Sequence, residues 1–154
     1  MARRPSLILA VAAVVLVGAC TGPGPAHYAA VLDELTIPSG WELAKTQVRA
    51  KDGDQHCDPL VNAGCPGVIR YYLVEGLPVD VYKPARNAVI DAGFAIDREF
   101  DPEACDAPPS APACGFFASR DGDRIEINLY NPGHDDGIGV GASNRSMVRV
   151  TASK

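Results

Sequence analysis

The sequence predicts an α+β fold: a two-layer sandwich in which a mainly antiparallel sheet carries two helices on one face. The expected order of elements is helix, strand, strand, helix, strand, hairpin and final strand, which leaves no room for repeated βαβ units. The clearest local signal is Asp121-Gly122, a dipeptide that suits a type I′ turn between two antiparallel strands. Together, the element order and the hairpin favour the antiparallel sandwich.

Two segments have the apolar spacing of amphipathic helices. The first is expected at 28–35, where apolar residues recur at i, i+3, i+4 and i+7. The second is expected at 81–92, with Asp80 as its cap and Gly93 in a left-handed conformation after its end. Pro84 fits only the first turn of a helix, which favours a later start. Its expected inward residues are Tyr82, Ala85, Val89 and Ala92.

The first two expected strands differ in pattern. The segment 68–74 is nearly all apolar and rich in β-prone residues, so we expect it to be the central strand, covered on both faces. The segment 41–48 alternates imperfectly, because Lys45 falls on the same face as Trp41 and Leu43.

The remaining strands alternate more regularly. The segment 94–100 places Phe94, Ile96 and Phe100 on one face. Strands at 116–120 and 123–130 flank the predicted hairpin turn, and a last strand is expected at 147–152. In the second hairpin strand the expected inward residues are Ile125, Ile127 and Leu129, and the expected outward residues are Glu126, Asn128 and Tyr130.

The N-terminus has the features of an export signal. Arg3 and Arg4 precede an apolar stretch at 7–17, and small residues then lead to Cys20. A run of this length with a basic flank is typical of a cleaved secretory signal, whereas a membrane span needs about 20 apolar residues. The general secretory route is expected rather than twin-arginine export, because Pro5-Ser6 stands where aromatic and apolar residues would follow.

The end of this leader, Val17-Gly18-Ala19-Cys20, resembles the lipobox of small bacterial lipoproteins of the actinobacterial type. The resemblance implies that 1–19 is a cleaved signal peptide and that Cys20 is lipidated. A diacylated cysteine would hold the chain on the outer face of the cell membrane, because each buried methylene contributes about 0.8 kcal/mol. The alternative is an ordinary secretory signal with a coincidental cysteine. The resemblance covers only the leader, and no defined family is recognised for 28–154.

After the leader, a lipidated cysteine and flexible tether are expected at 20–27, followed by a single domain at 28–154. Removal of 1–19 leaves 12 basic and 19 acidic residues, a net charge of −7. An acidic domain is a poor candidate for binding nucleic acid or for adsorbing directly to anionic lipid. The lipid anchor is therefore the expected link to the membrane, and no nucleic-acid partner is expected.

Four cysteines remain when Cys20 is set aside, and an even number in an exported chain favours two disulfides. We expect the pairs Cys57–Cys65 and Cys105–Cys114, because each brackets a short loop rich in Pro, Gly, Asp and Ala. Long-range pairing between the two loops is the open alternative. Zinc and redox sites fit less well, since the pairs enclose seven and eight residues and no C-x-x-C motif exists.

Acidic and histidine residues are the first candidates for a binding site. The acidic set lacks the glycine and glutamate of a calcium-binding EF-hand loop, which favours ordinary turn chemistry. His134-Asp135-Asp136 with His56 could bind a metal or act in acid–base chemistry, but the spacing is not that of a ligand motif. His27 is a weaker candidate within the tether. The acidic set comprises Asp52, Asp54, Asp58, Asp121 and Asp123.

The glycine-rich segment 137–141 is the last candidate. Its spacing is G-x-G-x-G, which lacks the G-x-G-x-x-G of a dinucleotide site, and a strand rather than a helix is expected after it. The surrounding loop, 131–144, is long enough to act as a mobile flap over a ligand.

These observations predict no catalytic residue, no metal site and no cofactor. The sequence has no G-x-S-x-G motif, and its four remaining cysteines are expected to be oxidised. The expected function is that of a non-catalytic, membrane-anchored envelope lipoprotein that binds a protein partner or an envelope component. The alternative is a small-ligand or metal-binding lipoprotein that uses the 131–144 loop, and an envelope enzyme of unknown type ranks third.

Overall fold

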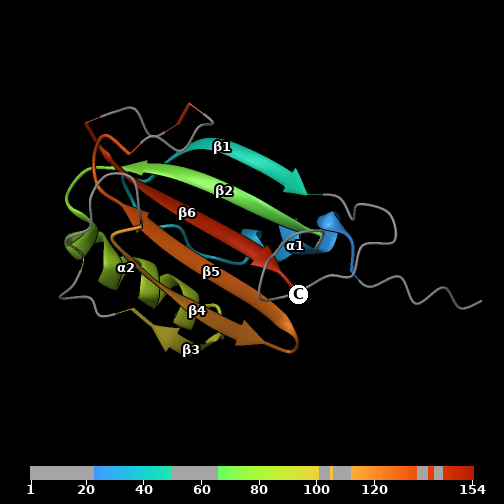
Figure 1. The fold of residues 1–154 in the computed structure, drawn as a ribbon. Coiled ribbons are helices and arrows are strands. Elements are labelled where there is room, and N and C mark those ends of the chain that lie inside the picture. Colours follow the sequence, from blue (N-terminus) through green and yellow to red (C-terminus); the bar gives the residue numbers. More distant parts are fainter. Residues whose placement is uncertain (1–22, 50–65, 101–104, 106–111, 135–138, 141–143) are drawn as a thin grey trace, which may run out of the picture.

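The computed structural model describes residues 23–49, 66–100, 105, 112–134, 139–140 and 144–154. Within these residues the chain forms a six-stranded antiparallel sheet and two helices (Figure 1), which confirms the predicted α+β class. In chain order the elements are α1 (Pro25–Asp33), β1 (Glu42–Arg49), β2 (Gly67–Val74), α2 (Pro78–Asp91), β3 (Ala95–Glu99), β4 (Cys114–Arg120), β5 (Asp123–Tyr130) and β6 (Ser146–Ser153).

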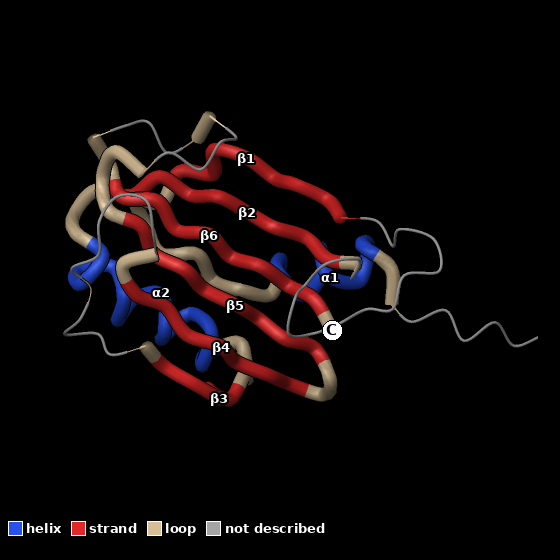
Figure 2. Tube along the Cα trace, in the orientation of Figure 1, coloured by secondary structure: helices blue, strands red, loops and turns tan. Residues whose placement is uncertain are grey.

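The strand order across the sheet is β1-β2-β6-β5-β4-β3 (Figure 2). The C-terminal strand β6 inserts between β2 and β5, so β2 lies second from the edge. The prediction that β2 is the central strand is therefore wrong. Its apolar composition still has the expected cause, because Val68 and Tyr72 are buried on one face and Ile69 and Tyr71 on the other.

Both helices lie on the same face of the sheet, as predicted (Figures 1 and 2). Helix α1 packs on β2 and β6, and α2 packs on β4 and β5. The side chains between the helices and the sheet form the helix-side core. Its largest fully buried members include Tyr28, Leu32, Val89, Phe116, Ile125 and Leu129. The opposite surface of the sheet is called the helix-distal face below.

Both helices begin earlier than predicted, and each begins at a proline. Helix α1 starts at Pro25, within the segment expected to be tether, and α2 starts at Pro78 rather than near Pro84. Proline suits the first position of a helix, where its fixed φ is favourable and no N–H is needed. Asp80 lies inside α2 and accepts a hydrogen bond from the Leu77 N–H at 3.4 Å, so it supports the helix start from within the first turn.

Pro84 therefore lies inside α2 rather than in its first turn. Proline has no backbone N–H, so the hydrogen bond that residue 84 would otherwise donate to the Asp80 carbonyl is lost. The loss lowers the stability of the helix. The buried stripe includes the predicted Tyr82, Ala85 and Val89, together with Val81 and Ala88. Burial of this stripe against the sheet explains why the helix continues through Pro84.

Both edge strands contain an irregularity that changes which face their side chains occupy. In β1 the register shifts between Leu43 and Lys45, so Leu43 lies opposite Tyr72 and Lys45 lies opposite Tyr71. A bulge of this kind moves later side chains to the other face. It accounts for the imperfect alternation around Lys45.

In β3 the register shifts between Ile96 and Arg98. The prediction that Phe100 shares a face with Phe94 and Ile96 is wrong, because the shift sends Arg98 and Phe100 to the helix-distal face. Arg98 lies opposite Phe117, and the Phe100 N–H donates to the Gly115 carbonyl at 2.9 Å. Phe94 and Ile96 stay against the helix-side core.

The turn predictions are confirmed. Asp121 and Gly122 both have positive φ, 54° and 90°, as a type I′ turn requires, and Arg120 pairs with Asp123 across the hairpin. Gly93 has φ 85° directly after α2, the left-handed conformation expected there.

Candidate functional site

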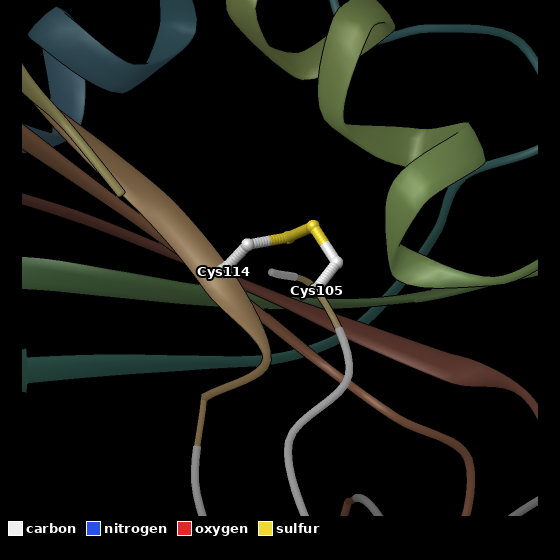
Figure 3. The surroundings of a disulfide bond; sticks show 2 residues. All are labelled: Cys105 and Cys114. Atoms are coloured by element: carbon white, nitrogen blue, oxygen red, sulfur yellow. A yellow bond between two sulfur atoms is a disulfide. The ribbon is translucent and has the colours of Figure 1, made fainter. Parts of the chain in front are cut away.

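Cys105 and Cys114 form a disulfide, as the short-loop pairing predicts. Figure 3 shows the Cys114 side chain leaving β4 on the side of the helices, where it meets Cys105. Both residues are buried within the helix-side core. The disulfide therefore fastens the segment before β4 to the core, and it removes two thiols from possible nucleophilic chemistry.

The other predicted covalent sites lie outside the described residues. These are the leader with its lipidation site Cys20, and the second cysteine pair, Cys57 and Cys65. Their roles stay predictions. Among the described residues, no helix is long and apolar enough to cross a membrane.

The two described histidines, His27 and His134, contact residues at opposite ends of β5. The His27 Nε2 lies 2.7 Å from Asp123 Oδ1, at the first residue of the strand. His134 stacks on Tyr130, the last residue of the strand, with ring centroids 4.0 Å apart and an interplanar angle of 22°. The two imidazoles therefore belong to different environments, and each has a structural contact.

The remaining acidic and histidine candidates do not form a described site. Asp121 occupies the hairpin turn, as turn chemistry predicts. Within the part of the chain that the structure describes, no group of three or more His, Cys, Asp or Glu side chains is arranged to hold a metal ion. The candidates outside the described residues are Asp52, Asp54, His56, Asp58, Asp135 and Asp136.

A second apolar cluster lies on the helix-distal face. This distal cluster consists of Ile69, Tyr71, Tyr130 and Met147, all buried, with Leu73 and Val140 packed against it. Val140 belongs to the glycine-rich part of the 131–144 loop, and His134 belongs to its start. These two side chains of the loop therefore pack against the sheet, His134 on Tyr130 and Val140 on the distal cluster.

Polar side chains adjoin the distal cluster. Arg149 lies 3.1 Å from the Glu126 carboxylate, and the Asn128 amide donates to the same carboxylate oxygen at 2.6 Å. Asn128 is only 4% exposed, and the Arg149 guanidinium lies 5.9 Å from the centroid of the Tyr130 ring. Glu126 Oε1 thus accepts hydrogen bonds from a guanidinium and an amide, so that this oxygen is already engaged within the protein.

Nearer to β3, the helix-distal face carries two arginines and two phenylalanines, which we call the Arg–Phe patch (Arg98, Phe100, Phe117 and Arg124). The two phenyl rings meet edge to face with centroids 5.8 Å apart. Arg98 lies over Phe100 at 5.5 Å, and Arg124 lies over Phe117 at 4.4 Å. Phe100 is 40% exposed. Arginine and aromatic side chains that remain accessible are the residue types that dominate binding interfaces.

The tyrosines with perturbed acidity lie on the opposite side, in the helix-side core. Burial, with a smaller contribution from Glu99, raises the pKa of Tyr82 to about 12. Burial and the nearby Asp123 carboxylate also raise the pKa of Tyr28. Phenols held neutral in this way serve packing rather than proton transfer near neutral pH.

No family model matches the chain, and searches of the curated proteins and of the solved structures found no match.

Sequence reasoning found part of this surface and missed the rest. Alternation along β5 correctly placed Glu126, Asn128 and Tyr130 away from the core. The Arg–Phe patch was missed because the register shift in β3 leaves no trace in the alternation. One available signal was the Phe116-Phe117 pair, since adjacent residues of a strand point to opposite faces and one aromatic ring must leave the core.

Proposed function

We propose that the chain is a membrane-anchored lipoprotein of the cell envelope whose domain binds a protein partner or another envelope component without catalysing a reaction. The observation that carries the binding function is the Arg–Phe patch, where Phe100 is 40% exposed beside two arginines. Phe116, the neighbour of Phe117 in β4, is fully buried because its ring points towards the helices. The accessible rings of the patch are thus available to a partner.

A non-catalytic role is supported by the state of the reactive groups. The Cys105 and Cys114 thiols are joined, and the Glu126 carboxylate is engaged by Arg149 and Asn128. The anchoring part of the proposal is supported by the leader sequence, which ends in the lipobox-like Val17-Gly18-Ala19-Cys20. An anchor at Cys20 restricts possible partners to those near the outer membrane face.

Site-specific photo-cross-linking in intact cells tests the binding function. Ala95 is exposed and lies opposite Ser119 beside the patch, so a cross-linker placed there should capture the partner. A cross-linker at Asn87, an exposed residue of α2, is the matched control on the other layer. We expect a specific adduct from position 95 only. The absence of any adduct above background from position 95 would remove the support for a stable partner.

Cell fractionation tests the anchor. Cys20→Ala should release or mislocalise the protein, because the acyl chains can no longer attach. If the variant stays bound to the membrane and is correctly processed, the anchoring part of the proposal is wrong.

A second candidate is a small-ligand site beside His134, at the described start of the 131–144 loop. It is favoured by the His134 ring, which is 7% exposed and stacks on Tyr130. Thermal-shift screening of anionic and aromatic metabolites with the wild type and with His134→Ala tests it. Calorimetry with calcium and zinc tests the metal-binding form, and the absence of heat would count against that form.

A further inference from the structure

The arginines of the domain fall into two groups. Of the eight in the described residues, five pair with a carboxylate, and Arg49, Arg98 and Arg124 form no ion pair with any described residue. The ion-paired set comprises Arg70–Asp33, Arg86–Glu99, Arg120–Glu34, Arg145–Glu42 and Arg149–Glu126. In a domain with a net charge of −7 after the leader, carboxylates are plentiful. Among the described residues, these three arginines therefore differ from the other five in having no carboxylate within ion-pair distance.

All three of these arginines lie on the helix-distal face. Arg98 and Arg124 lie opposite Phe117 and Ser119 in the ladders, and Arg49 lies opposite Gly67 on the far side of the sheet. The neighbouring Phe116 and Ile125 point into the helix-side core, which fixes the orientation of these ladders. The three arginines that form no ion pair with a described residue thus share one face of the sheet, with Arg98 and Arg124 towards β3 and Arg49 at the β1 edge.

Two of these guanidinium groups rest on the phenyl rings of the Arg–Phe patch. A guanidinium that lies over a ring uses its flat face for the cation–π contact and leaves N–H donors at its edge. Those donors match a carboxylate, which can accept two parallel hydrogen bonds from one guanidinium. The ring also limits the rotamers of the arginine, so less side-chain entropy is lost when an anion binds.

The spacing of the patch suits an extended acidic segment. Phe100 lies level with Gly115, Arg98 lies opposite Phe117, and Arg124 lies opposite Ser119. The patch therefore runs along the strands from Phe100 to Arg124. A segment that lies along it could place an aromatic side chain on the exposed Phe100 ring and carboxylates on the two guanidinium groups. The net negative charge of the rest of the domain would repel such a segment elsewhere and so favour this location.

A protein segment fits this surface better than a lipid bilayer does. An anionic bilayer is a broad surface and would face much of the acidic domain, which it would repel, whereas a single acidic segment needs to contact only the patch. The exposed apolar part is confined to the Phe100 and Phe117 rings, which can accept one side chain of a partner.

We propose that the Arg–Phe patch binds an acidic, aromatic-containing segment of the partner protein, with carboxylates on Arg98 and Arg124; this inference rests on the binding function proposed above. A fluorescein-labelled peptide of repeated Glu-Glu-Phe units is the probe, and a Gln-Gln-Phe peptide is the uncharged control. Fluorescence anisotropy with the full chain in mild detergent measures binding. The affinity for the acidic peptide should fall with added salt.

The decisive comparison uses two double variants with the same change in charge. R98Q/R124Q removes both guanidinium groups of the patch and should weaken peptide binding about tenfold, the effect of losing charge-assisted hydrogen bonds. R49Q/K83Q removes two positive charges outside the patch, neither of which forms an ion pair with a described residue, and should leave the affinity within about twofold. Thermal unfolding followed by circular dichroism shows that both variants fold.

Three outcomes would overturn the inference: no binding of the acidic peptide by the wild type, equal weakening in both double variants, or equal binding of the uncharged peptide. Co-sedimentation with phosphatidylglycerol vesicles forms a separate arm. Vesicle binding that only R98Q/R124Q abolishes, without peptide binding, would identify the patch as a membrane-contact surface instead.

The cellular cross-link from position 95 separates this inference from the function that it rests on. An adduct that R98Q/R124Q does not reduce would leave the proposed function in place and overturn the role of the patch. Peptide binding that depends on the patch, without any adduct in cells, would support the chemistry of the patch and contradict the proposed function.

Discussion

The two faces of the sheet use the same strands for different purposes. On the helix-side face, apolar side chains fill the space beneath α1 and α2, and the Cys105–Cys114 disulfide joins them. On the helix-distal face, alternate residues of the same strands bring together arginines, aromatic rings, an amide and a carboxylate. The difference shows how period-2 alternation lets one sheet carry a core on one side and a chemically mixed surface on the other.

The largest expected effect comes from adjacent phenylalanines on opposite faces. Phe116 has no exposed surface and contacts Tyr82 edge to face, so Phe116→Ala should destabilise the fold by about 3–5 kcal/mol. Phe117 is partly exposed, and Phe117→Ala should cost no more than about 1 kcal/mol. Urea unfolding measures both values. Equal losses would show that the two faces of β4 contribute equally to stability.

The disulfide is the next largest contribution on the helix-side face. Replacing both Cys105 and Cys114 with alanine removes a cross-link between residues nine apart in sequence, and the chain-entropy model gives a loss of about 2–3 kcal/mol. Reduction of the wild type under the same conditions should lower the urea midpoint by a similar amount. A midpoint of the double variant at the wild-type value would show that the disulfide does not stabilise the helix-side face.

The raised pKa of Tyr82 predicts a loss of stability at alkaline pH that arises on the helix-side face. Its pKa of about 12 lies above the ordinary value of 10.0, so its contribution is fully present below pH 10 and is lost between pH 10 and 12. At pH 11 the wild type should have lost about 1.4 kcal/mol more than Tyr82→Phe, which carries no ionisable group there. Urea titrations at pH 9 and pH 11 test this, and parallel losses in the two proteins would contradict it.

Much of the fold could be predicted because the relevant signals are local. The apolar stripe of α2, the Asp121-Gly122 turn and the position of Gly93 each follow from neighbouring residues. The place of β6 between β2 and β5 could not be predicted, because strand order depends on which long-range pairing buries the most surface. The apolar composition of β2 indicated burial on both faces, which is correct. It could not distinguish a central strand from the strand next to the edge.

The candidate site was harder to predict than the fold. The orientations of Glu126, Asn128 and Tyr130 followed from simple alternation, but their mutual contacts depend on Arg149, which reaches them from another strand. The position of Phe100 depends on the register shift in β3. A bulge is a property of how two strands pair, so no pattern within residues 94–100 reveals it.

The smallest expected effect on stability comes from the arginines of the patch. Arg98 and Arg124 form no ion pair with the described residues, so R98Q/R124Q should lower the free energy of unfolding by only about 1 kcal/mol, from the loss of two exposed cation–π contacts. Urea unfolding at neutral pH, with R49Q/K83Q as the charge-matched control, measures this change. A loss above about 2 kcal/mol would show that the guanidinium groups hold the sheet together. A small loss of unfolding free energy combined with weakened peptide binding would show that the two arginines contribute mainly to binding and little to the stability of the fold.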